Sequence, residues 1–423
     1  MSKEKEMIVL TKVSRHENCC IFKAPTPLQR TNPKAFQPEI VSVGPYHYND
    51  KGLETIQMHK QRFLELFLET GNRLGGPVSM TSLEDDVGAL EETIRDSYSE
   101  HLQLSREELV KIMILDGCFI IMVVLVALRH VSFGSDTIFT VPIFTVPWIL
   151  PTLRRDLLLL ENQVPYIVLE TLFAKSGIDV SLKRLLCEFF SSSLRFLSVE
   201  RVMERIVGSE PRHLLHLIRQ SQIPPSSSQL NRLGATSYVP RKRDIFPARK
   251  LELQGIEFKA DWSANTILAI GLQNNALVIP HLLLDQFTGT LLYNVVAFEQ
   301  CCMKSEDHFT SYIVLMGFLM NDKEDVSLLR EKCIIGNCFS GDYEKTSHFF
   351  KGLSKCIALD LSRTYFEPTF EVINAYTCKR GTGYWARFKR NYFDSPWVLV
   401  SFIVVFLMLI AVFRSVVAPF VQE

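Results

Sequence analysis

Two histidines in the pattern His213-x-x-His216 could help to hold a zinc ion, because imidazoles one helical turn apart can reach one metal. A structural zinc site needs four ligands, and the sequence spacing supplies neither a third nor a fourth. The ten cysteines form no C-x-x-C pair, and the vicinal pairs at 19–20 and 301–302 fit buried thiols better than a redox centre. We therefore expect structural histidines and cysteines, with no metal and no cofactor.

A second set of polar residues could do acid–base chemistry. His47, His59, Asp116 and Glu161 lie in apolar surroundings, where shifted pKa values arise. His47 closes the turn Gly44-Pro45-Tyr46-His47, which could bind a ligand or be a turn pinned by aromatic packing. If the four side chains converge on one solvent-reachable cleft, we expect an enzyme; if they are scattered and hydrogen-bonded in the core, we expect none.

Known catalytic signatures are absent from the sequence. It has no G-x-x-x-x-G-K-[ST] phosphate loop, no G-x-G-x-x-G, no H-E-x-x-H and no G-x-S-x-G. Glu161-Asn162-Gln163 stands before Pro165, where a helix must end, and these side chains can satisfy backbone groups that the break leaves free. No small-molecule substrate is indicated.

The elements that position these residues are predicted to be mostly helical. Apolar residues at three- and four-residue steps predict helices over 52–70 and 85–101. Ser105-x-x-Glu108 is a capping-box pattern, and the helix it begins should continue through LVKIMILDGCFIIMVVLVALRH. The uncharged part of that helix, 117–128, is too short to cross a bilayer, so we expect a core helix. Further helices are expected over 148–160, 164–173, 289–303, 308–320, 326–331 and 343–355.

Non-helical segments interrupt this pattern. The repeat at 138–147, IFTVPIFTVP, carries two prolines five apart and is expected to be extended. Asn274-Asn275 between two apolar runs predicts a β-hairpin near 267–279. Residues 222–250 are rich in proline and serine, which predicts a linker or loop. Its basic cluster at 241–243 could contact anionic lipid, or it could lie in a solvated loop. The fold class is therefore mainly α with small β elements.

Composition narrows the class of protein. Lysine plus arginine and aspartate plus glutamate number 46 each, so a dedicated nucleic-acid binder is not expected. With 47% apolar and 22% charged residues, disorder over the whole length is excluded.

The carboxyl-terminal region predicts a transmembrane helix. No residue from 395 to 413 is charged, and the 18 residues from 396 to 413 would span about 27 Å as a helix. Thirteen of them are Leu, Ile, Val or Phe, which favours insertion by roughly 4 to 8 kcal/mol. Aromatic side chains mark the expected span at Trp397, Phe402, Phe406 and Phe413. The alternative is a buried carboxyl-terminal core helix.

The flanking charges predict the orientation. Five basic residues precede the span, and only Arg414 follows it, so residues 1–394 should be cytosolic. No secretory signal is recognisable at the amino terminus. We expect a single-pass tail anchor, in the plasma membrane, with the lipid bilayer as one partner. The topology-setting basic residues are Lys379, Arg380, Arg387, Lys389 and Arg390.

The sequence divides into seven expected segments. They are a proline-punctuated segment packed on the core (1–50), a helical core (51–221), a linker or loop (222–250), a second helical part (251–378), a basic juxtamembrane segment (379–394), a transmembrane helix (395–414) and a short tail (415–423).

A series of motifs makes a family resemblance specific. They are Cys20-Ile21-Phe22-Lys23, Val41-Ser42-Val43-Gly44-Pro45-Tyr46-His47, Met58-His59-Lys60-x-Arg62, Met113-Ile114-Leu115-Asp116-Gly117-Cys118-Phe119, DLLLLENQVPYIVL from Asp156, Asn294-Val295-Val296-Ala297-Phe298-Glu299-Gln300 and Tyr392-Phe393-x-Ser395-Pro396-Trp397. With these motifs in order over nearly the whole chain, the sequence resembles the plant "domain of unknown function 247" family (UPF0481-type proteins). Tyr48 stands where a second histidine is common.

The resemblance implies a mainly helical plant protein with a carboxyl-terminal anchor and no established catalytic residues. Some members are similar to male determinants at grass self-incompatibility loci, which act in pollen–stigma recognition. Our leading hypothesis is a membrane-anchored recognition or signalling protein that binds partner proteins without catalysis, as such a determinant or a relative of one. The alternative is an undescribed membrane-bound, hydrolase-like enzyme with a polar site in the helical core.

Overall fold

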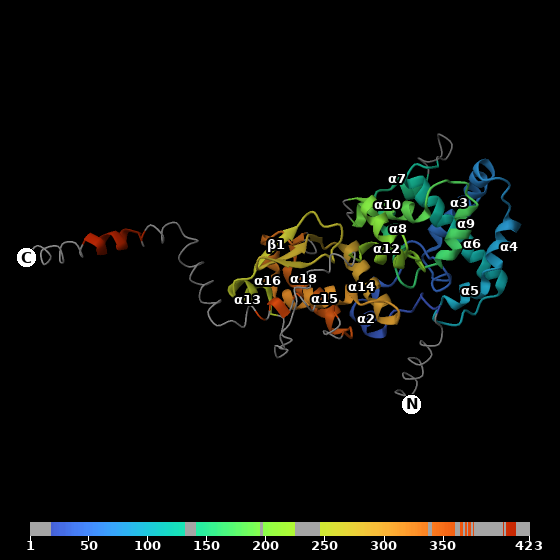
Figure 1. Cartoon of the computed structure of the whole chain (residues 1–423). Helices are drawn as coiled ribbons and strands as arrows, with labels where there is room; N and C mark the ends of the chain where they lie inside the picture. The colour runs from blue at the N-terminus through green and yellow to red at the C-terminus, as the bar shows by residue number, and fades with distance from the viewer. Residues whose placement is uncertain are drawn as a thin grey trace, which may run out of the picture.

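The computed structural model describes residues 18–131, 141–194, 198–224, 246–336 and 341–359, with short pieces at 364–366, 369, 371–373, 375, 401 and 403–411. Within these residues the chain is mainly helical with two small sheets, as predicted. Figure 1 shows α3–α10 gathered at one end of the body, with β1, α13, α15, α16 and α18 at the other. A single buried hydrophobic cluster extends from Cys19 to Ile373 and joins the two ends.

Helix α6, Arg106–Ala127, is the central helix of the first end. It begins at the predicted capping box, in which Ser105 and Glu108 each accept from the other's backbone N–H. After an exposed, charged first turn, most of its side chains from Ile112 to Val126 are apolar and buried on all faces, which is typical of a core helix. Helices α3 and α9 pack on it, and α9 comes so close that a Cβ on Gly117 would lie 2.4 Å from Leu172 Cδ1.

The other helices of this end cover α6 or pack beside it. Their bounds are α3 Glu54–Leu74, α4 Met80–Gly88, α5 Glu91–Asp96, α7 Pro142–Thr145, α8 Ile149–Asp156, α9 Tyr166–Ala174, α10 Leu182–Leu194, α11 Val199–Ile206 and α12 Leu214–Gln222.

The second end combines helices with the sheets. Strands β1 (Glu257–Asp261) and β3 (Ala276–Pro280) are parallel, and β2 (Gly271–Gln273) pairs antiparallel with β3. Asn274 and Asn275 form the predicted hairpin turn, both with positive φ. Strands β4 (Leu282–Leu283) and β5 (Ile335–Gly336) form a second, parallel pair. The helices are α13 Ala248–Leu253, α14 Gln286–Cys301, α15 His308–Leu319, α16 Lys323–Glu331 and α18 Tyr343–Lys355.

Three local expectations were wrong. The helix expected over 85–101 is divided into α4 and α5, and Tyr98 instead forms a β-bridge with Ile21. Within the proline repeat, Pro142 begins the short helix α7 rather than an extended segment, because proline fits the first turn of a helix. Helix α8 ends at Asp156, four residues before the end predicted for it at residue 160.

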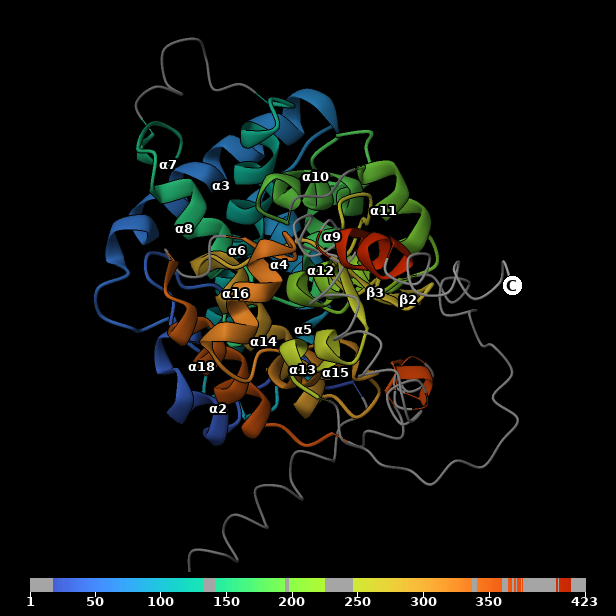
Figure 2. The same cartoon turned by 90° about the vertical axis from the view of Figure 1, so that its left-hand side faces the viewer.

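The amino-terminal segment crosses the body. Helix α2 (Thr26–Thr31) contacts α18, and the 3₁₀ turn η1 (Pro33–Ala35) contacts α14. Figure 2 shows α2 beside α18, although more than 300 residues of sequence separate them.

Among the described residues, one helix is long and apolar enough to cross a membrane, and that helix is α6. In its most apolar stretch 89% is buried inside the protein, which agrees with the prediction of a core helix.

Candidate functional site

An irregular segment, residues 36–48, connects η1 to α3, and we call it the strap. Its backbone N–H groups bind buried side chains instead of a neighbouring strand. Asp156 is 0% exposed, and its Oδ2 accepts from the N–H groups of Glu39, Ile40 and Val41 at 2.9, 2.8 and 3.2 Å. Arg155 donates to Asp156 Oδ1 at 2.7 Å and so balances the carboxylate.

The turn after α8 supplies one more side chain to the strap, that of Asn162, while the side-chain N–H groups of Gln163 bond within the turn itself. Asn162 Oδ1 accepts from Val43 N at 2.6 Å, and its Nδ2 donates to the carbonyls of Val41 and Asp156. Gln163 Nε2 donates to the carbonyls of Leu157 and Leu159, both at 2.8 Å. Asn162 and Gln163 thus satisfy backbone groups at the break, as predicted, whereas Glu161 binds groups of the amino-terminal segment instead.

A buried ion pair holds the next turn of the strap. Lys60 on α3 is 0% exposed and Asp116 on α6 is 2% exposed, and Lys60 Nζ donates to Asp116 Oδ1. Lys60 also donates to the carbonyl of Ser42 at 2.5 Å, while Asp116 Oδ2 accepts from Gly44 N at 2.8 Å. Burial raises the pKa of Asp116, and the Lys60 charge opposes that shift.

Gly44 is required by two features of this turn. Its φ is +72°, and a Cβ there would lie 2.3 Å from the carbonyl oxygen of Gln163. That same carbonyl accepts from the buried hydroxyl of Tyr98 at 2.9 Å. The turn is therefore pinned by close backbone contact and aromatic packing, with Tyr46 and Tyr98 edge to face at 5.3 Å.

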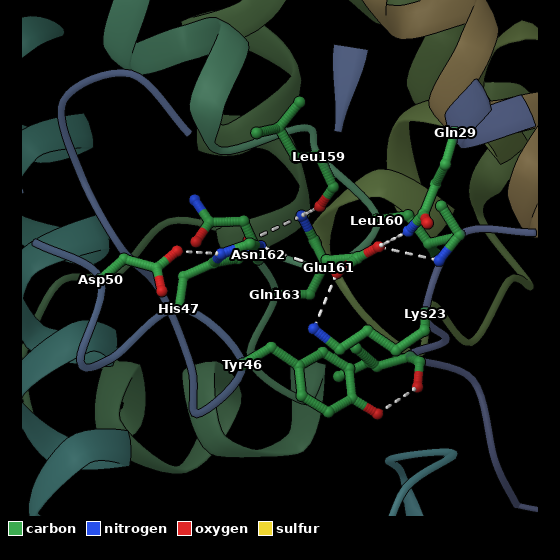
Figure 3. Close-up of polar contacts among 12 residues, drawn as sticks. Lys23, Gln29, Tyr46, His47, Asp50, Leu159, Leu160, Glu161, Asn162 and Gln163 are labelled. Atoms are coloured by element: carbon green, nitrogen blue, oxygen red, sulfur yellow. Dashed lines mark hydrogen bonds and ion pairs between the residues drawn. The ribbon is translucent and has the colours of Figure 1, made fainter. Parts of the chain in front are cut away.

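Glu161 is the centre of the polar cluster in Figure 3, which we call the Glu161 cluster: Lys23, Gln29, His47, Asp50 and Glu161. Glu161 Oε2 accepts from Lys23 Nζ at 2.8 Å, and Oε1 accepts from Gln29 Nε2 at 3.0 Å and from Ala24 N at 2.9 Å. The carboxylate therefore ties the chain before α2 to the turn after α8.

His47 lies at the edge of the Glu161 cluster. Its Nδ1 is 2.6 Å from Asp50 Oδ2, and its Nε2 is 3.8 Å from Glu161 Oε2. Within the described part of the chain, Nε2 is buried without a hydrogen-bond partner. A histidine oriented by a carboxylate is the arrangement of a general base, and it is the one catalytic feature that this cluster offers.

The four acid–base candidates do not all meet. His47 and Glu161 lie side by side, whereas Asp116 is enclosed with Lys60. His59 is half-buried on α3, and no hydrogen bond or ion pair between described residues joins it to the other three. The described cavity is lined by none of the four.

The histidine pair has a structural role. His213 precedes α12 and its Nδ1 accepts from His216 N at 3.3 Å, which caps the helix. Burial lowers the pKa of both imidazoles, that of His216 to about 3. Searched over the described ranges, the structure contains no group of three or more His, Cys, Asp or Glu side chains that could hold a metal.

Most residues expected in and beside the transmembrane helix lie outside the described residues: Trp397, Phe402, Phe413, Lys379, Arg380, Arg387, Lys389 and Arg390. Residues 403–411 are helical, and Phe406 among them is 62% exposed. The basic cluster at 241–243 also lies outside the description.

Sequence reasoning missed the partners of the strap. Lys60 and Asp156 both stand in the family motifs, but nothing local indicated that each is buried against backbone of the strap. The sequence pattern that could have indicated a buried charge is a charged residue directly before an apolar run, as in Asp156 before four leucines.

Comparisons with known proteins agree with the motifs. The family DUF247, described as "Plant protein of unknown function", matches residues 21–411. The chain is 39% identical to UPF0481 protein At3g47200 of Arabidopsis thaliana, over 99% of this chain and 90% of that protein. It is 21% identical to Putative UPF0481 protein At3g02645 of the same plant, over 93% of this chain and 88% of that protein. No solved structure matches. The chain therefore belongs to the plant DUF247 family.

Proposed function

We propose that this protein is a membrane-anchored recognition or signalling protein that binds partner proteins with its folded body and performs no catalysis. The observation that carries the proposal is the apolar helix at 403–411. Eight consecutive large apolar side chains, 403–410, are each between 41% and 64% exposed. A contiguous apolar surface of this kind is costly in water, so we infer that lipid covers it.

The use of the polar core groups supports the absence of catalysis. Asp116, Asp156 and Glu161 accept from backbone N–H groups of the amino-terminal segment, and each is also paired with a cation. Groups committed to several hydrogen bonds in the ground state are poorly placed to exchange protons with a substrate. Their arrangement fits a rigid scaffold for a binding surface.

A matched pair of substitutions tests the anchor. Met408→Arg places a charge within the exposed helix, and Met303→Arg makes the same change at a body residue that is 88% exposed. An arginine at the centre of a span costs about 2.5–3.5 kcal/mol, a large part of the insertion free energy expected from the sequence. We expect Met408→Arg to shift protein into the supernatant on alkaline extraction of membranes, and Met303→Arg to stay in the pellet like the wild type.

Two outcomes contradict the anchor. One is release of the intact wild type by alkali; the other is equal behaviour of the two variants. In sealed vesicles, protease should remove an amino-terminal epitope, since the five basic residues from Lys379 to Arg390 predict a cytosolic body. Protection of that epitope would reverse the topology.

Affinity purification from membranes tests whether the body binds a partner protein. Affinity purification of the full chain should return a stoichiometric partner protein, and deletion of residues 225–245 tests whether that segment binds it. A pollen-side self-incompatibility determinant at the plasma membrane, or a relative of one, is the specific form of the proposal that the family resemblance implies. If the wild type returns only the proteins that a Met408→Arg variant and an empty resin also return, the recognition proposal is contradicted.

The alternative, a hydrolase-like enzyme, is favoured by one observation, the His47–Asp50 pair beside Glu161. Turnover of a small ester such as p-nitrophenyl acetate tests it, with His59→Gln as the matched control for His47→Gln. Our proposal expects equal background rates for wild type and both variants. Saturable turnover lost only in His47→Gln would favour the enzyme.

A further inference from the structure

We propose that the cavity of about 260 Å³ at the second end of the body binds a small uncharged aromatic molecule. The described lining contains no residue of the Glu161 cluster, so this inference does not depend on the proposed function. Apolar residues that solvent reaches, an aromatic pair held in place by its neighbours and a lining without basic residues each favour such a ligand.

The cavity lies where two parallel strands end. Asp261, the last residue of β1, pairs with Pro280, the last residue of β3, and both residues line the cavity. Leu291 of α14 and Phe309 of α15 line it as well. Concave sites with mostly apolar walls and a few polar groups are the usual form of small-molecule sites.

Part of the apolar lining is accessible to solvent. Ala264, Ile267 and Leu283 are half-buried, and Trp262 is 61% exposed. Apolar surface in contact with water is unfavourable, so an apolar ligand that displaces this water gains free energy. Because an apolar cavity of about 150 Å³ can hold benzene, one of about 260 Å³ has room for a ring with a short substituent.

Strand β5 fixes the positions of two side chains of the lining. His281 and Leu283 are two residues apart at β4, so they lie on the same face of that strand. A Cβ placed on Gly336 of β5 would lie 2.9 Å from His281 Cε1 and 3.4 Å from Leu283 Cδ1, so both side chains lie directly over this glycine. His281 Nδ1 also donates to the carbonyl of Cys333 at 2.7 Å, which fixes the orientation of the ring.

Trp262 continues this layer of side chains. Its ring stacks on that of His281, with ring centroids 4.2 Å apart and planes inclined by 19°, and both residues line the cavity. A large, exposed aromatic side chain beside a cavity offers a surface on which another aromatic ring can pack. We therefore infer an aromatic rather than an aliphatic ligand.

The charge of the lining favours an uncharged ligand. Among the described residues that line the cavity, none is lysine or arginine, so an anion finds no basic partner there. Asp261 is the one carboxylate of the described lining, and its Oδ1 already accepts from the N–H and the hydroxyl of Ser263, at 2.8 and 2.6 Å. A charged group that loses its hydration without a full set of partners is unfavourable.

The test uses three ¹⁹F NMR probes of similar shape: 4-fluorobenzyl alcohol, 4-fluorobenzylammonium and 4-fluorobenzoate. They are titrated into the full-length chain in mild detergent, with empty micelles as the blank. We expect the alcohol to bind with a dissociation constant of about 1 mM or tighter, and at least about fivefold more tightly than either charged probe. Weaker binding of the alcohol, or a smaller preference over either charged probe, overturns the proposal.

Displacement of the bound probe tests the preference for an aromatic ring. Benzyl alcohol should displace 4-fluorobenzyl alcohol at a concentration about threefold or more below that needed of cyclohexylmethanol, whose ring is saturated and not flat. Equal displacement by the two alcohols, or stronger displacement by cyclohexylmethanol, contradicts the aromatic ligand.

Two exposed tryptophans provide a matched pair of variants. Trp262→Leu removes the ring beside the cavity and should weaken 4-fluorobenzyl alcohol about threefold or more. Trp148→Leu makes the same change at a tryptophan that is 59% exposed and outside the lining, and it should bind like the wild type. If the two variants bind the probe equally, the proposal fails.

A second pair locates the binding by filling the cavity. Ala264→Phe places a ring in the lining and should weaken the probe at least about tenfold, whereas Ala89→Phe places it at an exposed residue outside the lining and should have no effect. Equal binding by these variants would place the site elsewhere. Far-UV circular dichroism and thermal unfolding establish which variants fold, and the tryptophan pair decides if Ala264→Phe does not.

Discussion

The buried pair of Lys60 and Asp116 gives the sharpest test of the scaffold. Lys60→Met keeps the length of the side chain and removes its charge, which leaves a carboxylate that is 2% exposed without its cation. Breaking a buried ion pair from one side costs about 3–5 kcal/mol. Asp116→Asn should cost a similar amount, although its amide oxygen can still accept from Gly44 N.

The double variant separates charge from packing. With both charges absent, only the lost donor to the Ser42 carbonyl remains unfavourable, at about 1–2 kcal/mol. We therefore expect the double variant to be more stable than either single variant by at least about 2 kcal/mol. Urea unfolding followed by pulse proteolysis of the full chain measures the difference.

The pH dependence gives an independent check on the same pair. Burial already raises the pKa of Asp116, and loss of Lys60 raises it further, so folded Lys60→Met binds a proton more tightly than the unfolded chain. The difference in free energy of unfolding between Lys60→Met and the wild type should therefore shrink as the pH falls from 7 towards 5, by up to about 1.4 kcal/mol per pH unit. Additive single effects, or a deficit independent of pH, would refute the reasoning.

Substitutions at three further positions test local features by thermal or urea unfolding. Gly44→Ala should cost about 3 kcal/mol, from its positive φ and the clash with the Gln163 carbonyl; a loss below 1 kcal/mol would contradict that geometry. His216, whose pKa burial lowers from 6.5 to about 3, is neutral when folded but protonated when unfolded between those values, so stability falls as the pH drops below 6.5. His216→Asn should remove about 2.7 kcal/mol of the loss between pH 7 and 4.5, and an unchanged acid limb would refute this. Asn275, at φ +65°, should tolerate glycine but lose about 1 kcal/mol on change to alanine, and equal stability of the two variants would argue against the turn.

Features encoded by neighbouring residues could be predicted from the sequence. The capping box at Ser105 and the hairpin turn at Asn274-Asn275 depend on residues within four positions of each other, and both are present. The side chains of Asn162 and Gln163 also satisfy backbone groups a few residues away. In each case the chemistry is local, so the residue types suffice.

Features that depend on distant pairing could not be predicted. Strand β1 was missed because its partner, β3, is parallel and joined to it through another strand, which leaves no hairpin signal. Lys60 gave no sign that it is fully buried, because its partners lie 18 and 56 residues away. The strap itself carries no periodicity, since its N–H groups bind single side chains and not a ladder.

The acceptors that hold the strap also set an order for its assembly on the ribosome. The backbone N–H groups of the strap bind side chains far along the chain: those of Glu39, Val43 and Gly44 bind side chains 117, 119 and 72 residues later. The Ala35 carbonyl of η1 accepts from Asn294, 259 residues later. The strap therefore cannot complete these hydrogen bonds before Asn162 has been synthesised, and η1 cannot do so before Asn294. A chain stopped before Asn294 should therefore leave η1 open to protease, because it lacks the side chain that binds the Ala35 carbonyl.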